Sequence, residues 1–343
     1  MKDIYIITDY RGKLYSSIRY WDASLDLDLV KKAFAKLNYR VYFVSFSDII
    51  QRINDFKDTF IIYPSSEDPG GQYKGFIEDV VLALNETQAK LIPPFPYLRA
   101  HHNKVFMELF RKIHLSEKFN ILPSFVYGTY EDYLKDIDRF LDHEWVLKPA
   151  SGALSSGVKL LISRSDKVKL PKRASNSHNL VDSFKVSLKH LLKFLYKNYI
   201  KKSTHRNKFI VQKYIKGLTG DYKVLVYGDK FYVVQRMNRD NDFRASGGGK
   251  LIIEPTFPLG LLDYAHSFTE EIKTPFVSLD IAFDGLKFYL IEFQFLNFGN
   301  YTLEKSTRFF QRTMGEWQQV NMPSQLEVEF VYSIKKFIDE NWN

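Results

Sequence analysis

The sequence predicts an α/β fold with a parallel sheet in its first part and an α+β fold with antiparallel strands in its last part. Before residue 97, short apolar runs alternate with amphipathic segments of helical period, which is typical of a parallel sheet covered by helices. After residue 206, apolar runs flank the turn sequences Gly228-Asp229 and Asp284-Gly285, which favour hairpins. Prolines at 93, 94 and 96 mark the first boundary. We therefore expect three domains, at 1–97, 98–206 and 207–343.

In the first domain we expect three strands and two helices. The apolar runs Ile4–Ile7, Val41–Val44 and Phe60–Tyr63 are strand candidates, and Leu25–Leu37 and Phe76–Leu84 have helical periodicity. The segment 64–71 is rich in Pro, Gly and Ser and follows the third strand directly. It therefore lies at the carboxyl end of a predicted parallel strand, where α/β sheets bind their ligands.

The other two domains combine helices with strands. Helical periodicity predicts helices at 103–114, 130–141 and 184–200. Apolar runs predict strands at 145–149, 209–214, 222–227, 231–236, 277–283 and 288–293.

Composition and the N-terminal residues exclude several classes of protein. The chain of 343 residues has no cysteine, which rules out a disulfide framework, a thiolate metal site and a cysteine nucleophile. No apolar run approaches the roughly 20 residues of a membrane span, and Met1-Lys2-Asp3 carries an acid where a signal peptide is basic and then apolar. We therefore expect a cytoplasmic globular protein without a transmembrane segment.

The net charge of +9 is concentrated in one segment. Residues 159–216 contain sixteen Lys or Arg and two Asp, so this segment alone carries +14. The helix expected at 184–200 has five lysines at intervals of four residues: Lys185, Lys189, Lys193, Lys197 and Lys201. Its apolar positions are Leu188, Leu191, Leu192, Leu195 and Tyr199. We expect the apolar side to pack on the sheet and the lysines to point outward.

Three interpretations of the Lys185–Lys201 face remain open. It is a solvated surface, a guide for an anionic acceptor substrate, or a docking surface for a membrane or a nucleic acid. Lysines one helical turn apart repel one another by tenths of a kcal/mol per pair, and an anionic partner would relieve that repulsion. The few aromatic residues of the segment fall on its apolar side, which disfavours base stacking.

The stretch Lys148–Val158 joins a lysine at the end of a predicted strand to a loop of small residues. Such a loop exposes backbone N–H groups and is able to close over phosphates. It is not a Walker A loop, because Val158 stands between Gly157 and Lys159. The alternative for this stretch alone is an ordinary glycine-rich surface turn.

Two acids and an amide form a candidate metal site. Asp280 and Glu292 lie on consecutive predicted strands, and Gln294 shares a face with Glu292 because it lies two residues beyond. These are hard oxygen ligands of the kind that Mg²⁺ prefers. A two-residue turn would put the two acids on opposite faces, so a shared metal requires a three-residue loop or a bulge. The alternative is that both acids are simply solvated.

Arg236 and Arg244 lie between these two motifs, and Arg244 precedes the run Gly247-Gly248-Gly249. Arginine beside a glycine-rich backbone suits the binding of phosphate or carboxylate, although surface arginines are common. The histidines lack the helical spacing and third ligand of a zinc site.

The order of these motifs resembles the ATP-grasp superfamily, and in particular its carboxylate–amine ligases, such as D-alanine-D-alanine ligase, glutathione synthetase and the ribosomal-protein glutamate ligases. The resemblance covers residues 98–300: Asn103-Lys104 before a helix, strand-Lys-Pro with its small-residue loop, Gln-Lys-Tyr-Ile, Asp-Tyr-Lys, Phe-Arg before glycines, and Asp with Glu-x-Gln. It implies an ATP-grasp fold that follows an N-terminal parallel α/β domain.

The resemblance also implies a role for each motif residue. It makes Lys104 and Lys148 phosphate contacts and residues 151–157 a lid over the triphosphate, with Ser151, Gly152, Ser155, Ser156 and Gly157. The adenine would be held by the backbone of Gln212, Lys213, Tyr214 and Ile215, with Asp221 near the ribose. Arg236, Arg244 and Lys148 would be catalytic residues, and Asp280, Glu292 and Gln294 would bind magnesium. Substrate contacts would include Ser65, Ser66, Asn297 and Asn300.

Three positions depart from the pattern of the glutamate ligases. Gln294 and Ser246 each replace an Asn, and Phe298-Gly299 replaces Pro-Gly. Gln keeps the amide oxygen but lengthens the side chain by one methylene. The 64 residues from Lys148 to Gln212, which include the basic helix, are a longer interval than the family usually has.

The function implied by the resemblance is an ATP-dependent ligase that activates a carboxylate as an acyl phosphate, joins it to an amine and releases ADP and phosphate. ATP and two Mg²⁺ ions are the expected cofactors, with Mn²⁺ as an alternative. The substrates are small or carrier-linked, and their identity is open. A kinase that phosphorylates an acceptor, and a basic binding module with a degenerate nucleotide site, are the rival functions. The oligomeric state is also open, with a homodimer among the alternatives.

Overall fold

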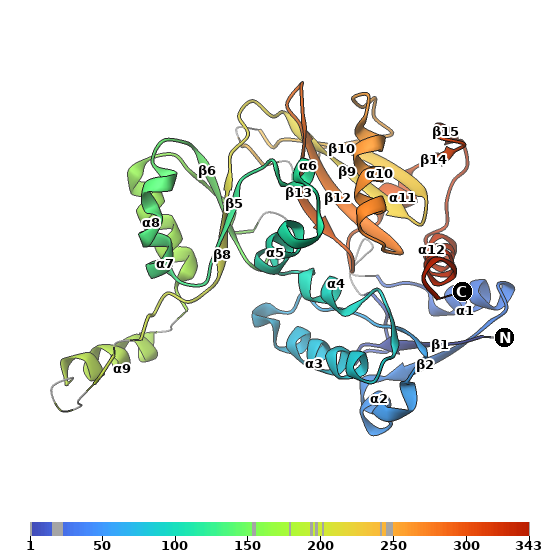
Figure 1. Cartoon of the computed structure of the whole chain (residues 1–343), viewed down its shortest axis with the longest axis horizontal. Helices are drawn as coiled ribbons and strands as arrows, with labels where there is room; N and C mark the ends of the chain where they lie inside the picture. The colour runs from blue at the N-terminus through green and yellow to red at the C-terminus, as the bar shows by residue number, and fades with distance from the viewer. Residues whose placement is uncertain are drawn as a thin grey trace. The chain divides into compact units, whose positions relative to one another are not determined.

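The computed structural model describes residues 2–15, 23–152, 156–177, 180–192, 195, 198–200, 202–240, 242–244 and 250–342 (Figure 1). The chain divides into two compact units. Unit 1 comprises residues 1–101, 113–120 and 217–343, and unit 2 comprises residues 102–112 and 121–216. Unit 1 thus groups the N-terminal region with the C-terminal one, and the three domains expected from the sequence stay a prediction.

The N-terminal part of unit 1 contains a four-stranded parallel sheet in the order β2-β1-β3-β4. Its strands are β1 (Lys2–Thr8), β2 (Tyr39–Ser45), β3 (Phe60–Ile62) and β4 (Lys90–Ile92). Its helices are α1 (Leu27–Lys36), α2 (Phe46–Gln51), α3 (Gln72–Glu86) and α4 (Phe95–Ala100), with short 3-10 turns at Ile53–Phe56 and Pro69–Gly71. The three expected strands are confirmed, and β4 is a fourth that the sequence analysis missed.

The rest of unit 1 is built on a seven-stranded sheet. Its strands are β9 (Gly220–Tyr227), β10 (Lys230–Met237), β11 (Leu251–Ile253), β12 (Phe276–Phe283), β13 (Phe288–Gln294), β14 (Phe309–Thr313) and β15 (Glu316–Val320). The main order is β13-β12-β9-β10-β14-β15, and every pair is antiparallel. Helices α6 (Glu117–Asn120), α10 (Leu261–Glu271), α11 (Tyr301–Lys305) and α12 (Leu326–Trp342) complete the unit.

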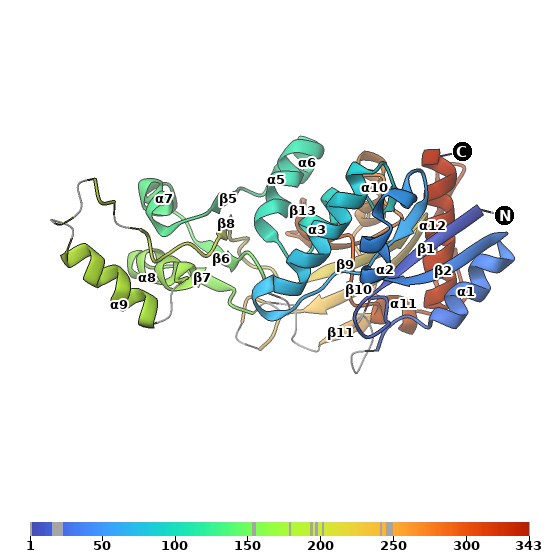
Figure 2. The same cartoon turned by 90° about the horizontal axis from the view of Figure 1, so that it is seen from below.

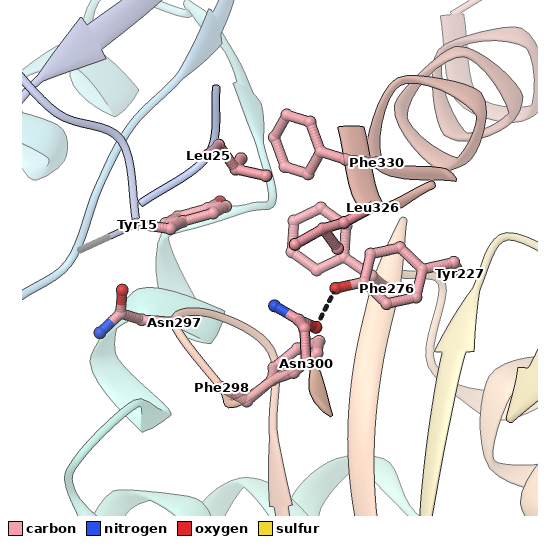
Figure 3. A pocket seen from close by; sticks show the side chains of 9 residues that line it. All are labelled: Tyr15, Leu25, Tyr227, Phe276, Asn297, Phe298, Asn300, Leu326 and Phe330. Atoms are coloured by element: carbon pink, nitrogen blue, oxygen red, sulfur yellow. Dashed lines mark hydrogen bonds between the residues drawn. The ribbon is translucent and has the colours of Figure 1, made fainter. Parts of the chain in front are cut away.

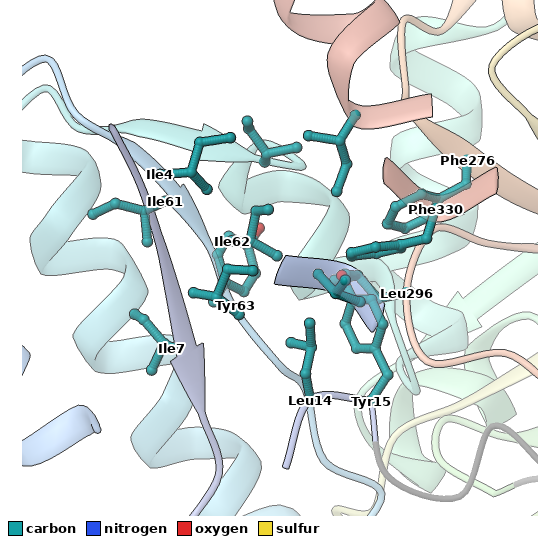
Figure 4. Close-up of a cluster of buried hydrophobic side chains, with 14 of the residues drawn as sticks. Ile4, Ile7, Leu14, Tyr15, Ile61, Ile62, Tyr63, Phe276, Leu296 and Phe330 are labelled. Atoms are coloured by element: carbon teal, nitrogen blue, oxygen red, sulfur yellow. The ribbon is translucent and has the colours of Figure 1, made fainter. Parts of the chain in front are cut away.

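One hydrophobic core joins the two sheets of unit 1. Ile4, Ile61 and Ile62 of the parallel sheet belong to the same buried cluster as Phe276 of β12 and Phe330 of α12 (Figure 4). Tyr15 meets the rings of Phe276 and Phe330 edge to face, with centroids 6.1 and 5.7 Å away. Because these side chains are nearly fully buried, the N-terminal sheet is fixed to the sheet that carries the candidate metal residues.

Unit 2 contains a four-stranded antiparallel sheet in the order β5-β8-β6-β7. Its strands are β5 (Ser124–Tyr127), β6 (Trp145–Pro149), β7 (Lys159–Leu161) and β8 (Phe209–Lys213). Its helices are α7 (Tyr130–Lys135), α8 (Arg164–Ser175) and α9 (Leu180–Leu191), and α5 (Lys104–His114) begins in this unit. A 3-10 turn lies at Ile137–Phe140. One face of the sheet packs an aromatic cluster that includes Tyr133, Phe140 and Trp145.

The basic helix differs from its sequence-based prediction. It is α9, which begins at Leu180 and ends at Leu191, and Lys193, Lys197 and Lys201 lie outside the described residues. The expectation that its leucines pack on the sheet is wrong, because Leu188 and Leu191 are 45% and 72% exposed. Figures 1 and 2 show α9 away from the sheet of its own unit, so none of the strands described for unit 2 lies beneath its exposed leucines.

Among the described residues, none of the helices is both long and apolar enough to cross a membrane.

Candidate functional site

Strands β12 and β13, at one edge of the seven-stranded sheet, bring the predicted metal residues together. A bulge between Asp280 and Ile281 shifts the register of β12 and β13, so that Asp280 lies directly opposite Glu292. Residues directly opposite in an antiparallel pair present their side chains on the same face. The condition that the sequence analysis set for a shared metal is therefore met, through a bulge. Ser278 lies opposite Gln294, which places the amide on the same face.

Two cations contact Asp280 from the neighbouring strands. Lys223 of β9 lies directly opposite Asp280, and its Nζ is 3.3 Å from Oδ1. Arg236 of β10 places Nη2 2.7 Å from Oδ2 of Asp280. The same guanidinium donates to both carboxylate oxygens of Asp221, from Nε at 2.6 Å and Nη2 at 2.7 Å. The geometry is a connected row of charges on β9, β10 and β12, formed by Asp221, Arg236, Asp280 and Lys223, and Glu292 of β13 lies opposite Asp280.

The charges in this row set its protonation states. Burial by itself raises the pKa of Asp280, but Arg236 and Lys223 outweigh burial and lower the pKa to about 2. Burial also raises the pKa of Asp221, against the attraction of Arg236. Asp280 is therefore ionised at neutral pH. The carboxylate of Asp221, which the resemblance placed near a ribose, is occupied by Arg236.

The side-chain oxygens of Asp280, Glu292 and Gln294 are chemically suited to bind a hard cation such as Mg²⁺. Glu292 is half-buried and accepts a hydrogen bond from Nε2 of Gln294 at 3.3 Å. The amide oxygen of Gln294 takes no part in this bond. A carboxylate offers about four lone-pair sites, so Asp280 keeps acceptor capacity beside its two cationic partners. Within the described residues, no group of three or more His, Asp or Glu side chains is arranged to hold a metal. Any metal at this row therefore relies on two carboxylates and on other oxygens.

Unit 2 contains the predicted phosphate and adenine residues. Lys148 of β6 donates from Nζ to Oε1 of Gln212 on β8, at 2.7 Å, and both side chains are buried. The other amide atom of Gln212, Nε2, is buried without a partner among the described residues. The sequence analysis assigned Gln212 to adenine through its backbone, whereas the structure shows that its side chain positions Lys148.

Gly152 of the predicted lid is bound through both of its backbone groups. Nζ of Lys104 donates to the carbonyl of Gly152 at 2.9 Å, and the N–H of Gly152 donates to Nε2 of His102 at 3.2 Å. Ser151 and Ser156 are exposed, and Ser155 lies outside the described residues. A Cβ on Gly157 would lie 2.8 Å from Cγ of Pro149, at a φ of 73°, so only glycine fits there without strain.

We expect ATP to change the hydrogen bonds of this glycine. If Lys104 binds phosphate, its ammonium group must share or leave the carbonyl of Gly152. Hydrogen–deuterium exchange on peptides that contain Gly152 and Gly157 measures this, and their protection is expected to rise when ATP and magnesium are added. Unchanged protection would contradict a lid in this segment.

The predicted adenine-binding segment continues from β8 along a groove of unit 2. The N–H groups of Lys213 and Tyr214 donate to the carbonyls of Pro123 and Glu144 at 2.8 and 3.2 Å, so these N–H groups are already engaged. The groove, with a volume of about 330 Å³, is lined by Leu141, Asp142, His143, Glu144, Ile162, Lys167, Lys213, Tyr214 and Lys216. Ile215 is half-buried. A purine edge would have to use the remaining backbone groups of this segment.

Arg244 is held within its own loop. It donates from Nε to Oδ2 of Asp242 at 2.8 Å, and the residues that follow it, from 245 to 249, lie outside the described residues. The structure therefore brings Arg236 into the charged row and pairs Arg244 with Asp242.

The two predicted substrate serines have different partners. Ser65 is buried, and its Oγ lies 2.7 Å from Nδ1 of His101, whose Nε2 is 3.2 Å from Oε1 of Glu67. Ser66 accepts a hydrogen bond from the N–H of Asp68. The sequence analysis missed His101 as the partner of Ser65 and Glu67 as the partner of His101, although Glu67 lies in the 64–71 segment and His101 lies two residues before Asn103. The hydroxyl, the imidazole and the carboxylate thus form one hydrogen-bonded chain. In such a chain each hydrogen bond polarises the next, and a proton is able to pass along it.

Asn297 and Asn300 line a small cavity and not an open substrate pocket. The cavity of about 10 Å³ is walled mainly by aromatic and leucine side chains (Figure 3), and it has room for about one water molecule. Asn300 accepts from the hydroxyl of Tyr227 and is 2% exposed. This cavity is too small for an acid or amine substrate, and the substrate role of the two residues stays a prediction.

The fold of this chain is that of the ATP-grasp enzymes. A solved D-cycloserine synthetase aligns with a TM-score of 0.55 and 13% identity, over 98% of this chain and 99% of that chain. The ATP-grasp ligase PsnB, complexed with precursor peptide PsnA2 and AMPPNP, aligns with a TM-score of 0.50 and 10% identity over 97% of each chain.

A third similar structure is that of the macrocyclase MdnC from Microcystis aeruginosa, bound with precursor peptide MdnA. It aligns with a TM-score of 0.50 and 10% identity, over 97% of this chain and 98% of that chain. No protein-family model and no curated protein sequence matches the chain. The ATP-grasp fold with an N-terminal parallel α/β sheet, as expected from the sequence, is thereby confirmed.

Proposed function

We propose that this protein is an ATP-dependent ligase that activates a carboxylate as an acyl phosphate and joins it to an amine. The observation that carries the proposal is the bulge between Asp280 and Ile281, which sets Asp280 opposite Glu292 on one face of the sheet. The fold of the similar structures supports the same reaction class, since they include a synthetase, a ligase and a macrocyclase.

The reaction has two steps. A carboxylate oxygen of the first substrate attacks the γ-phosphorus of ATP, and ADP leaves with the bonding electrons. The amine of the second substrate then attacks the acyl carbon, phosphate leaves, and the amine nitrogen loses a proton. No protein nucleophile is needed, which agrees with the absence of cysteine.

The residues of this chain would bind and orient the reactants. Lys104 and Lys148 would offset the charge of the phosphates, and the Gln212 side chain keeps Lys148 in position. Asp280, Glu292 and Gln294 would hold magnesium, which when bound neutralises phosphate charge. Arg236 keeps Asp280 oriented through the bond from its Nη2, so in this proposal it is a positioning residue rather than a direct phosphate contact.

A screen for ADP release, followed by trapping, tests the proposed reaction. Full-length protein with ATP and magnesium is incubated with pairs of carboxylates and amines, including amino acids, peptides and uronic acids, because two of the similar structures hold precursor peptides. Hydroxylamine is then added in place of the amine. A hydroxamate supports an acyl phosphate. ADP release with formation of a phosphate ester and no hydroxamate would instead identify a kinase.

Ser65→Ala tests the proposed substrate role of the loop after β3. The variant is expected to raise the KM for one substrate about tenfold, because it removes one hydrogen bond to the substrate or to His101. ATP affinity is expected to stay unchanged. Ser267→Ala on α10, whose hydroxyl donates only to the carbonyl of Asp263 among the bonds described for it, is the matched control. An unchanged KM for both substrates would remove Ser65 from the substrate site.

A further inference from the structure

Helix α9 exposes leucine and lysine side chains together. Leu188 and Leu191 are 45% and 72% exposed, and beyond the helix Leu195 and Ile200 are 61% and 84% exposed. Lys185 and Lys189 are exposed as well. The helix therefore presents apolar surface to solvent. Exposed apolar surface of this kind normally marks a contact with another molecule.

The lysines flank the leucines and do not lie opposite them. Lys185 and Leu188 are three residues apart, as are Lys189 and Leu192, and residues at this spacing are neighbours on a helix surface. Long lysine side chains beside an apolar stripe direct their ammonium groups to the polar side of an interface while their methylenes extend the apolar surface. The two kinds of side chain thus form one continuous surface.

Helix α9 has no buried residue among its described side chains, which run from Lys185 to Leu191. It has 12 residues, and isolated helices of about 12–15 residues are marginal in water. In Figures 1 and 2 it lies away from the sheet of unit 2. A partner that covers Leu188 and Leu191 would stabilise both the helix and its position.

We propose that α9 binds the surface of an anionic lipid bilayer and lies in the plane of its headgroups. Such a surface accepts leucine side chains and lysine charges at once, and α9 presents Lys185 and Lys189 beside the exposed Leu188 and Leu191. The helix is shorter than the roughly 20 residues of a membrane span, so it lies on the bilayer and does not cross it. A nucleic acid would bind the lysines but leave the leucines in water.

This proposal does not depend on the proposed ligase activity, because it rests on residues outside the candidate site. The probe is a set of sedimented vesicles made of phosphatidylcholine alone or of phosphatidylcholine with phosphatidylglycerol, with full-length protein. We expect binding to the anionic vesicles only, and a decrease of binding with rising salt. Lys185→Gln with Lys189→Gln is expected to reduce binding about thirtyfold, at about 1 kcal/mol for each lysine.

Three further variants separate charge, apolar contact and general damage. Lys185→Arg with Lys189→Arg is expected to bind like the wild type. Leu188→Gln with Leu191→Gln is expected to bind at least tenfold more weakly, since each leucine loses about 1.5 kcal/mol or more of burial. Lys169→Gln with Lys172→Gln changes two exposed lysines of α8 and serves as the matched control, which should bind like the wild type.

Three outcomes would overturn the proposal. One is equal binding of the wild type to neutral and anionic vesicles, and another is an equal loss of binding in the α8 and α9 lysine variants. The third is binding to a single-stranded RNA oligonucleotide or to an acidic protein without binding to anionic vesicles, which would assign α9 to another partner.

Discussion

Glu292→Gln is expected to lower the rate of ADP formation at least about a thousandfold, because it removes a charged ligand whose metal contributes several kcal/mol to the transition state. The fold is expected to stay intact. Glu292 is half-buried and accepts a hydrogen bond from Gln294 of the same strand, which the amide oxygen of a Gln side chain also accepts. ADP release with the substrate pair found in the screen measures the rate.

Magnesium titration gives a second readout that needs no substrate. In the wild type, magnesium is expected to strengthen ATP binding, and chelation with EDTA should reverse this. Glu292→Gln should bind ATP equally with and without magnesium. Glu316→Gln changes an exposed acid on β15 of the same sheet and is the matched control. If the Glu292 variant kept more than about a tenth of the wild-type rate, a change of barrier below about 1.4 kcal/mol, Glu292 would not be a metal ligand of the reaction.

Arg236→Met is expected to lower the free energy of unfolding by about 3–5 kcal/mol, because it removes the cation that contacts the buried Asp221 and one of the two cations that contact Asp280. Arg236 is 7% exposed at its side chain and contacts both Asp221 and Asp280. Denaturant unfolding of the full chain measures the effect. Arg312→Met, at an exposed position of β14, should change stability by less than about 0.5 kcal/mol.

The same row changes what is expected of Asp280→Asn. The sequence alone indicates a variant that loses turnover and keeps its stability. In the structure Asp280 neutralises Arg236 and Lys223, so we expect this variant to be less stable than the wild type, unlike Glu292→Gln. Equal stability of Arg236→Met and the Arg312 control would contradict the ion pairs on which this expectation rests.

The sequence predicted the strands of the site well because their apolar alternation and turn residues are local signals. The sequence analysis also indicated that Asp280 and Glu292 are able to share a metal only if the strand register is shifted. The structure contains the bulge that shifts it. The sequence did not predict the contact between Ser65 and His101, since 36 residues separate them and nothing local links a serine in a loop to an imidazole at the end of a helix.

The expectation for the leucines of α9 failed because periodicity does not show which element lies against a helix face. The leucines of α9 have a helical period, but none of the strands described for unit 2 lies beneath them. Asn297 and Asn300 are polar residues after a strand, but Asn300 bonds to Tyr227 and both line a cavity of about 10 Å³. Burial of a polar or apolar side chain is decided by the neighbouring elements, which a single sequence does not place.

The row of alternating charges also constrains how the sheet assembles. Asp221 lies opposite Arg236, and Lys223 lies opposite Asp280, on three adjacent strands. A slip of one residue in either pairing would turn one member of each pair to the other face and leave buried charges unmatched. Misaligned sheets would thus be unstable even though apolar residues dominate all three strands. The charged residues of these strands therefore also select, during folding, the strand alignment that places Asp280 opposite Lys223 and beside Arg236.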